Sequence, residues 1–204
     1  MKITAAQVKE LRDATGAGMM DCRNALEQAD GDLERAKQIL REAGKAGLAK
    51  RGGRSASEGV IDAYLHTPDP NLPAKLGVLV ELDCETDFVA KTDEFQRLAH
   101  EIALHIAVAD PAYVRREDVP GDVVERERAI YAKQAEGKPA HVVDRIVEGK
   151  LNDFYKQVVL LDQPYIRDDK QTIQDLLDAY SAKVRERLVL RRFARFRVGD
   201  ADGA

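Results

Sequence analysis

The segment LGVLVELDC, residues 76–84, decides the fold of this 204-residue chain. Apolar side chains occupy every second position of it: Leu76, Val78, Val80, Leu82 and Cys84. The acidic residues Glu81 and Asp83 fall between them, on the opposite face of an extended chain. A period of two is typical of a β-strand with one buried face. The segment therefore predicts a strand in a sheet that is covered on one side.

Two further strands are predicted beside this one. Residues 60–66 precede it, and the Pro-containing stretch 67–71 between them predicts the turn of an antiparallel hairpin. Near the end of the chain, over 189–198, apolar residues alternate with arginines. Helical patterns occupy 95–108, 122–136, 139–160 and a segment that Thr172 is placed to cap. The predicted fold class is α+β, a small antiparallel sheet of about three strands covered by helices.

The beginning of the chain has a different pattern. The first 43 residues predict three short helices. Thr4 and Gln7 form a capping-box pattern before the first helix, and Asp32 is placed to cap the third. Residues 44–59 are rich in Gly, Ala, Ser and basic side chains, which favours a linker with partial helix near Leu48.

Two domains follow from this change of pattern. We expect an N-terminal three-helix module with its linker over residues 1–54. We expect an α+β core and dimerisation domain with a C-terminal strand over residues 55–204.

Composition narrows the functional class. The chain has 32 Lys and Arg against 36 Asp and Glu, a net charge of −4, which argues against general nucleic-acid binding. There is no apolar run of about 18 residues and no signal-like start, so we expect a cytoplasmic protein without a membrane span. Cys22 and Cys84 are too few and too far apart for a disulfide scaffold or a Cys-rich metal site. Cys84, on the apolar face of its strand, is expected to be a small buried side chain.

The junction after the central strand is the strongest candidate for a binding site. Phe88 stands there between Asp87 and Lys91, where a strand gives way to a helix, and binding groups often lie on such junctions. The alternative is that Phe88 folds back into the core while Asp87 caps the next helix. The pattern alone leaves both interpretations open.

Other motifs are ambiguous or excluded. Met19 and Met20 follow a Gly-x-Gly break and are interpreted either as core residues of a small bundle or as a contact surface. The segment is not a phosphate-binding loop, since no Gly-Lys-Ser/Thr follows. His100 and His105 are five positions apart, about 140° around a helix, so they do not form the zinc-binding H-E-x-x-H pattern.

A run of arginines near the C-terminus is predicted to be a solvated strand edge. Contact with RNA or with an acidic patch on a partner is the alternative. The residues are Arg185, Arg187, Arg191, Arg192, Arg195 and Arg197.

Several segments together resemble the elongation factor Ts family. They are TGAGMMDCRNAL (15–26), CETDFVAK (84–91), EGKPAHVVDRIVEGK (136–150), LLDQPYI (160–166) and FARFRVGD (193–200). The resemblance extends in consistent order from about residue 2 to residue 200. It implies a guanine-nucleotide exchange factor that binds elongation factor Tu in its GDP form and promotes GDP release, with no covalent chemistry and no cofactor of its own.

The resemblance also implies roles for particular residues. By position, Thr86, Asp87, Phe88 and Val89 would reach toward the GTPase magnesium site, with the aromatic ring as a wedge that displaces Mg²⁺. The N-terminal module, similar to a ubiquitin-associated domain, would dock elsewhere on the GTPase. Its contact residues would come from Gly16, Ala17, Gly18, Met19 and Met20.

The chain resembles the short bacterial form of the family, with a single core subdomain. That form pairs as a homodimer, and the exposed edge of a small sheet gives a physical reason for pairing. The competing hypothesis is an adaptor whose N-terminal module binds peptides or helices and whose α+β domain only oligomerises it. An exposed Asp-Phe pair at the strand–helix junction distinguishes the two, because an adaptor has no use for it.

Overall fold

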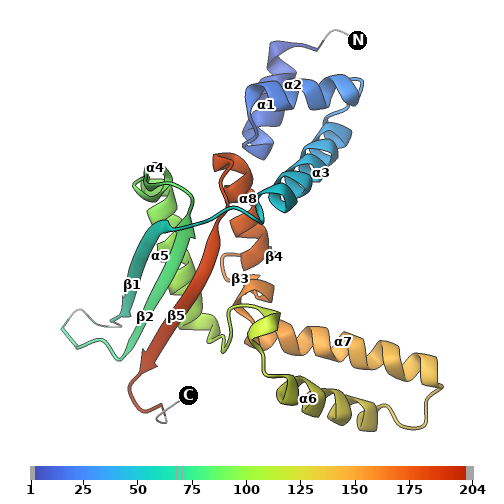
Figure 1. Cartoon of the computed structure of the whole chain (residues 1–204), viewed down its shortest axis with the longest axis vertical. Helices are drawn as coiled ribbons and strands as arrows, with labels where there is room; N and C mark the ends of the chain where they lie inside the picture. Colours follow the sequence, from blue (N-terminus) through green and yellow to red (C-terminus); the bar gives the residue numbers. More distant parts are fainter. Residues whose placement is uncertain (1–2, 68, 70, 201–204) are drawn as a thin grey trace.

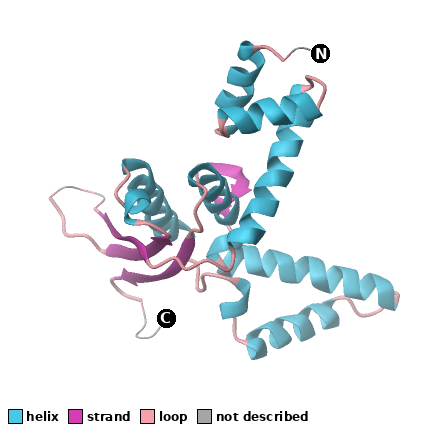
Figure 2. Cartoon of the chain, turned by 45° about the horizontal axis from the view of Figure 1, so that its top comes forward, coloured by secondary structure: helices cyan, strands magenta, loops and turns pink. Residues whose placement is uncertain are grey.

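The computed structural model describes residues 3–67, 69 and 71–200 and confirms an α+β fold. Helices gather at the N-terminal end, a small sheet lies in the body of the molecule, and two helices project from it (Figure 1, Figure 2). The predicted turn at 67–71 lies partly outside the described residues, because it includes Pro68 and Pro70.

The N-terminal module consists of α1 (Ala5–Thr15), α2 (Met19–Gln28) and α3 (Leu33–Arg51). The predicted capping box is present, with the Thr4 hydroxyl oxygen accepting from the backbone N–H of Gln7. The Asp32 carboxylate caps α3 by accepting from the N–H of Arg35 at 3.0 Å. A small cluster of buried side chains holds the three helices together: Val8, Leu11, Cys22, Ala25, Leu26, Ala29 and Ala36.

The predicted linker over 44–59 is too long, while the partial helix expected near Leu48 is present as the end of α3. The helix α3 continues through Gly44 and Gly47 to Arg51, leaving only residues 52–57 between it and the first strand. Each glycine costs about 1 kcal/mol in a helix relative to alanine. The Lys, Ala and Leu residues between and after them, over 45–46 and 48–50, are good helix formers. The end of α3 packs beside α8 (Ile173–Val184). Tertiary contact thus outweighs the local glycine signal.

The sheet has the order β1-β2-β5, and both strand pairs are antiparallel. The strands are β1 (Glu58–His66), β2 (Leu76–Cys84) and β5 (Val189–Arg197). The register pairs Val60 with Leu82 and Val80 with Phe193, so one face of all three strands is buried. The alternation in 76–84 therefore predicted the orientation of the central strand correctly.

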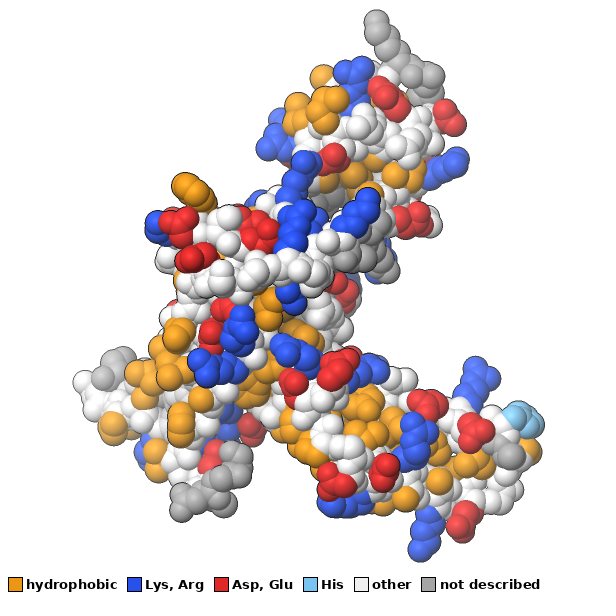
Figure 3. Space-filling view, viewed as in Figure 1, with side chains coloured by type: hydrophobic (Ala, Val, Ile, Leu, Met, Phe, Trp, Pro, Cys, Tyr) orange, Lys and Arg blue, Asp and Glu red, His pale blue; other side chains and the backbone are white. Residues whose placement is uncertain are grey.

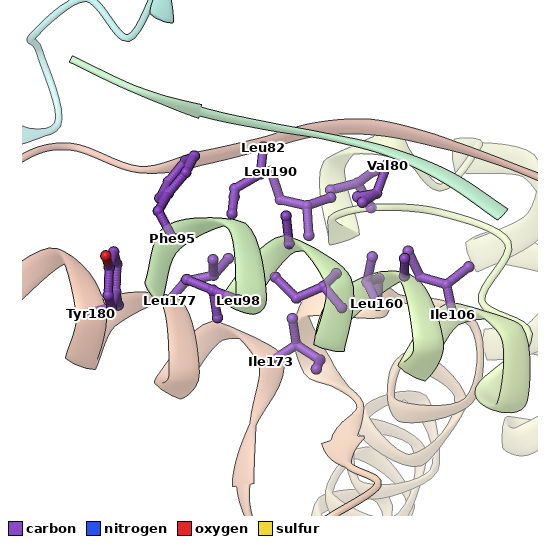
Figure 4. Close-up of a cluster of buried hydrophobic side chains, with 14 of the residues drawn as sticks. Val80, Leu82, Phe95, Leu98, Ile106, Leu160, Ile173, Leu177, Tyr180 and Leu190 are labelled. Carbon is purple, nitrogen blue, oxygen red and sulfur yellow. The ribbon is translucent and has the colours of Figure 1, made fainter. Parts of the chain in front are cut away.

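The main core lies between the sheet and two helices. The helix α5 (Asp93–Ala109) runs under the buried face of the sheet, and α8 packs on the other side of α5 (Figure 4). Phe95, Ile102 and Ile106 are fully buried along α5. The central layer of the core is thus a single helix, capped at its start by the Thr92 hydroxyl.

Two pairs of elements have an arrangement that the sequence did not indicate. The helices α6 (Gly121–Gln134) and α7 (Ala140–Val158) pack against each other and form an arm away from the sheet (Figure 1). Short 3₁₀ turns flank the arm at Arg116–Asp118 and Leu160–Asp162. The strands β3 (Pro164–Tyr165) and β4 (Asp168–Thr172) form a separate two-stranded ribbon before α8.

The two histidines of α5 bind different partners. His100 lies on the surface, with Nδ1 at 2.9 Å from the Asp62 carboxylate. His105 is buried, with Nε2 at 3.0 Å from the Gln163 side-chain oxygen. None of the described helices combines the length and apolar character needed to cross a bilayer.

Candidate functional site

The candidate site begins where β2 ends. A one-turn helix, α4 (Asp87–Ala90), follows the strand, and the Thr86 hydroxyl caps it by accepting from the N–H of Val89 at 3.4 Å. Phe88, at the outer side of this turn, is 79% exposed. In the space-filling view a hydrophobic side chain projects from the surface over α4 (Figure 3). The alternative with Phe88 in the core and Asp87 as a cap is therefore wrong, since Thr86 and Thr92 supply the caps.

The four predicted contact residues divide into outer and inner positions. Asp87 and Phe88 present their side chains outward, and Lys91 pairs with Asp87 across one turn. Val89 packs against the main core, and Thr86 is half-buried at the base of the turn. The Lys91 hydrogen bond holds the pKa of Asp87 below its usual value, so the outer end of the turn carries a charged carboxylate.

A residue that the sequence analysis missed anchors this turn. Glu186, between α8 and β5, accepts hydrogen bonds from the backbone N–H groups of Glu85 and Thr86 at 3.0 and 3.1 Å. Its second oxygen accepts from the Thr86 hydroxyl at 2.6 Å. No local signal could have linked residues separated by 100 positions in the sequence.

The N-terminal contact residues are also on the surface. Gly18 precedes the first turn of α2, where Met19 and Met20 are 55% and 63% exposed. Ala17 packs against the small module core. The interpretation of the two methionines as core residues is therefore wrong, and together they form an exposed flexible apolar pair, typical of adaptable contact surfaces.

The arginines near the C-terminus are mostly exposed, and several of them also form ion pairs within the chain. Arg191 and Arg192 pair with Asp83 and Glu81 on β2, and Arg195 lies 3.0 Å from Asp110. Arg185 and Arg187 reach across to other segments. The prediction of a solvated strand edge is confirmed, since β5 lies at the edge of the sheet and Arg191, Arg192 and Arg197 are exposed. The guanidinium groups of Arg191 and Arg192 also pair with acidic side chains of β2.

The cysteines have no features of a nucleophile. Cys84 is fully buried, and burial raises the pKa of its thiol to about 11. Its Sγ donates to the Thr86 carbonyl at 3.1 Å. Burial also raises the pKa of Cys22. Both thiols stay protonated at neutral pH, which agrees with the expected role of Cys84 as a small buried side chain.

Comparison with known proteins gives a consistent result. The family model described as elongation factor TS matches residues 45–200. An elongation factor Ts of Coprothermobacter proteolyticus is 56% identical over 202 residues, which cover 98% of this chain and 100% of that protein. The protein of the same name from Carboxydothermus hydrogenoformans is 55% identical, over 97% of this chain and 90% of its own length. That of Frankia alni is 54% identical, over 98% of both.

Proposed function

Because the chain belongs to the elongation factor Ts family, we propose that it is a guanine-nucleotide exchange factor for elongation factor Tu. It binds the GTPase in its GDP form and promotes GDP release, and so supports polypeptide chain elongation in the cytoplasm. The nucleotide and its Mg²⁺ belong to the partner. This chain forms and breaks no covalent bond, and contact with nucleic acid is not expected.

One observation carries the proposal: Phe88 stands almost free of its own domain, at the tip of a turn that is anchored at its base. A GDP site is held together by Mg²⁺ and by backbone donors around the phosphates. When an apolar ring inserts beside such a site, its surface is buried, and the free energy gained by this burial offsets the free energy lost with the Mg²⁺ coordination. Fully burying a Phe side chain is worth about 1.5–3 kcal/mol, which is roughly one to two decades in an equilibrium constant.

The remaining coupling comes from other contacts. The carboxylate of Asp87 adds a charged acceptor beside the ring, and Met19 and Met20 add apolar surface on the N-terminal module. Coupling between two ligands is reciprocal. If the factor weakens GDP binding by some ratio, an incoming nucleotide weakens factor binding by the same ratio. The cycle therefore needs no energy source, since the new nucleotide expels the factor.

The proposed homodimer has a surface suited to it. The face of the sheet that α5 does not cover carries apolar side chains from all three strands, among them Ile61, Leu65, Leu79 and Phe196. Antiparallel sheets with one free face normally present polar residues there. Charged side chains occupy one end of this face, and Leu65, Leu79 and Phe196 line a hollow at the other end. An exposed apolar patch of this kind is typical of an interaction site. We therefore assign the C2 contact to this face rather than to the sheet edge.

The decisive experiment is stopped-flow release of a fluorescent GDP from elongation factor Tu. The wild-type chain should accelerate release, and Phe88→Ala should lose about tenfold to hundredfold of that stimulation with an unchanged circular dichroism spectrum. Ile130→Ala, an exposed apolar residue on the arm, is the matched control and should behave as wild type.

The adaptor hypothesis predicts a different result. A wild-type chain that binds the GTPase or another partner without changing the rate of GDP release would support the adaptor and refute the exchange factor. Full stimulation by a folded Phe88→Ala variant would refute the wedge alone.

A further inference from the structure

Three consecutive residues between α8 and β5 touch both of the proposed contact regions. Arg185 is the C-cap of α8 and has a φ of 60°, a left-handed conformation that is uncommon outside glycine. Its guanidinium pairs with the Asp21 carboxylate in the first turn of α2. The side chain therefore joins the core to the helix that begins with Met19 and Met20.

The next residue, Glu186, holds the other region. Its carboxylate takes both backbone donors of Glu85 and Thr86 and the Thr86 hydroxyl. Hydrogen bonds to an ionised acceptor are shorter and stronger than neutral ones. They fix the residue that caps α4, and with it the direction in which Phe88 leaves the surface. The backbone of Glu186 is itself held, because its carbonyl accepts from the buried Ser181 hydroxyl.

The third residue, Arg187, fixes the connection between the two regions. Its N–H donates to the Glu85 carboxylate at 2.6 Å, and its guanidinium donates to the Arg54 carbonyl. Arg54 in turn lies 3.4 Å from the same Glu85 carboxylate. The segment that joins α3 to β1 is thus tied to the core at the base of α4, and the N-terminal module does not hang on a free tether.

We propose that Arg185, Glu186 and Arg187 form a positioning clamp that sets the spacing between the Phe88 turn and the Met19–Met20 surface. Both surfaces then meet the GTPase in one docking event. Groups that are held in place before binding do not lose freedom when they bind. Two contacts joined by a stiff spacer reinforce each other only when the spacer matches the distance between their sites. The clamp rests on the exchange function proposed above.

The clamp predicts separate effects for its parts. Without the Glu186 carboxylate the Phe88 turn loses its anchor, so Glu186→Ala should lower the maximal rate of GDP release at saturating factor by about tenfold or more. Glu186→Gln should restore most of that rate, because the amide oxygen can accept both backbone N–H groups and the amide nitrogen can donate to Thr86. Hydrogen exchange at the amides of Glu85 and Thr86 should speed up in the Ala variant only.

Arg185→Gly isolates the second half of the clamp. Glycine suits a left-handed C-cap, so the fold should be retained or stabilised. The guanidinium that holds Asp21 is lost, so the factor concentration for half-maximal stimulation should rise about tenfold while the maximal rate stays near wild type. Arg128→Ala removes another exposed ion pair between two elements, with Glu148, and is the matched control without effect.

All variants are compared in the full chain, with wild type and Phe88→Ala in the same release assay. The clamp is overturned if Arg185→Gly and Glu186→Ala match wild type, or if Glu186→Gln is as impaired as Glu186→Ala with the same melting temperature. A wild-type chain that does not accelerate release overturns the exchange function itself. Stimulation by wild type with unaffected clamp variants overturns the clamp alone.

Discussion

Lys91 lies one helical turn beyond Asp87, and its ammonium donates a hydrogen bond of 2.5 Å to the Asp87 carboxylate beside the exposed Phe88 ring. This bond keeps the carboxylate ionised and oriented at the outer end of α4. The pair lies on the surface, where such pairs contribute little to folding. We therefore expect the pair to act in partner binding, by presenting the ionised Asp87 carboxylate at the surface.

Removing this carboxylate tests that conclusion. We expect Asp87→Ala to slow stimulated GDP release roughly tenfold, the effect of losing one charge-assisted contact, while the melting temperature stays unchanged. Stopped-flow release and a thermal melt measure the two quantities. Asp122→Ala, which breaks an equivalent exposed pair with Arg126 on α6, is the control. A melting point that drops in Asp87→Ala but not in the control would assign the pair to folding instead.

The exposed methionines give a second prediction. The double variant Met19→Ala, Met20→Ala should bind GDP-loaded elongation factor Tu about tenfold or more weakly, because two apolar side chains lose contact area. Isothermal calorimetry measures the affinity, and Leu72→Ala is a control at another exposed apolar residue. An unchanged affinity would show that the first turn of α2 is not part of the interface with the GTPase. Deleting residues 1–54 is a poorer test, since it also removes the end of α3 that packs on α8.

The free face of the sheet gives a third prediction. Phe196, 72% exposed on β5, is expected to lie in the contact between two copies. Phe196→Glu places a charge in that contact, so the dimer should dissociate to monomers at micromolar concentration. Light scattering gives the mass. Val108→Glu, on α5 away from that face, should remain a dimer. Wild type of monomer mass would refute the dimer altogether.

His105 gives a prediction about pH. Burial lowers the pKa of this histidine below 6.5. The Gln163 amide donates to the carbonyls of Ala109 and Gln157, so its oxygen accepts from His105 Nε2, and the Ile166 N–H faces Nδ1 at 3.4 Å. A proton on Nδ1 would oppose that donor. The neutral ring is therefore the form that fits.

The lowered pKa of His105 determines how the free energy of unfolding changes with pH. As pH falls below about 6.5, the unfolded chain takes up a proton that the native chain refuses, so the free energy of unfolding decreases until the lower native pKa is reached. Urea unfolding at about pH 7.5 and pH 5.5, at a fixed protomer concentration, should show this loss in wild type and a smaller loss in His105→Gln. Equal losses in both would show that other groups cause it.

Local patterns predicted much of this molecule. The alternation in residues 76–84 gave the central strand and its buried face, and Thr4, Asp32 and Thr172 marked helix starts because their side chains act within three residues. Exposure was harder, since Phe88 and Met20 are apolar and a pattern cannot tell a core residue from a contact residue. The structure distinguishes the two cases, because it shows that the side chains of Phe88 and Met20 are exposed.

Long-range relations could not be predicted at all. The anchoring of Thr86 by Glu186, the pairing of the arginines with Glu81 and Asp83, and the packing of α6 on α7 depend on which segments meet in space. The extent of the helix through Gly44 and Gly47 was underestimated for the same reason, because its support comes from α8.

The position of β5 beside β2 also has a consequence for how the protein is made. Residues 185–197 are synthesised long after β2, and until they leave the ribosome β2 has only β1 for a neighbour in the sheet. A lone two-stranded hairpin is marginally stable at best in water. Glu186 is missing from the nascent chain as well, so Thr86 has nothing to hold it. The growing chain thus leaves one edge of β2 unpaired, and it completes the three-stranded sheet and anchors the α4 turn together, once residues 185–197 have been synthesised.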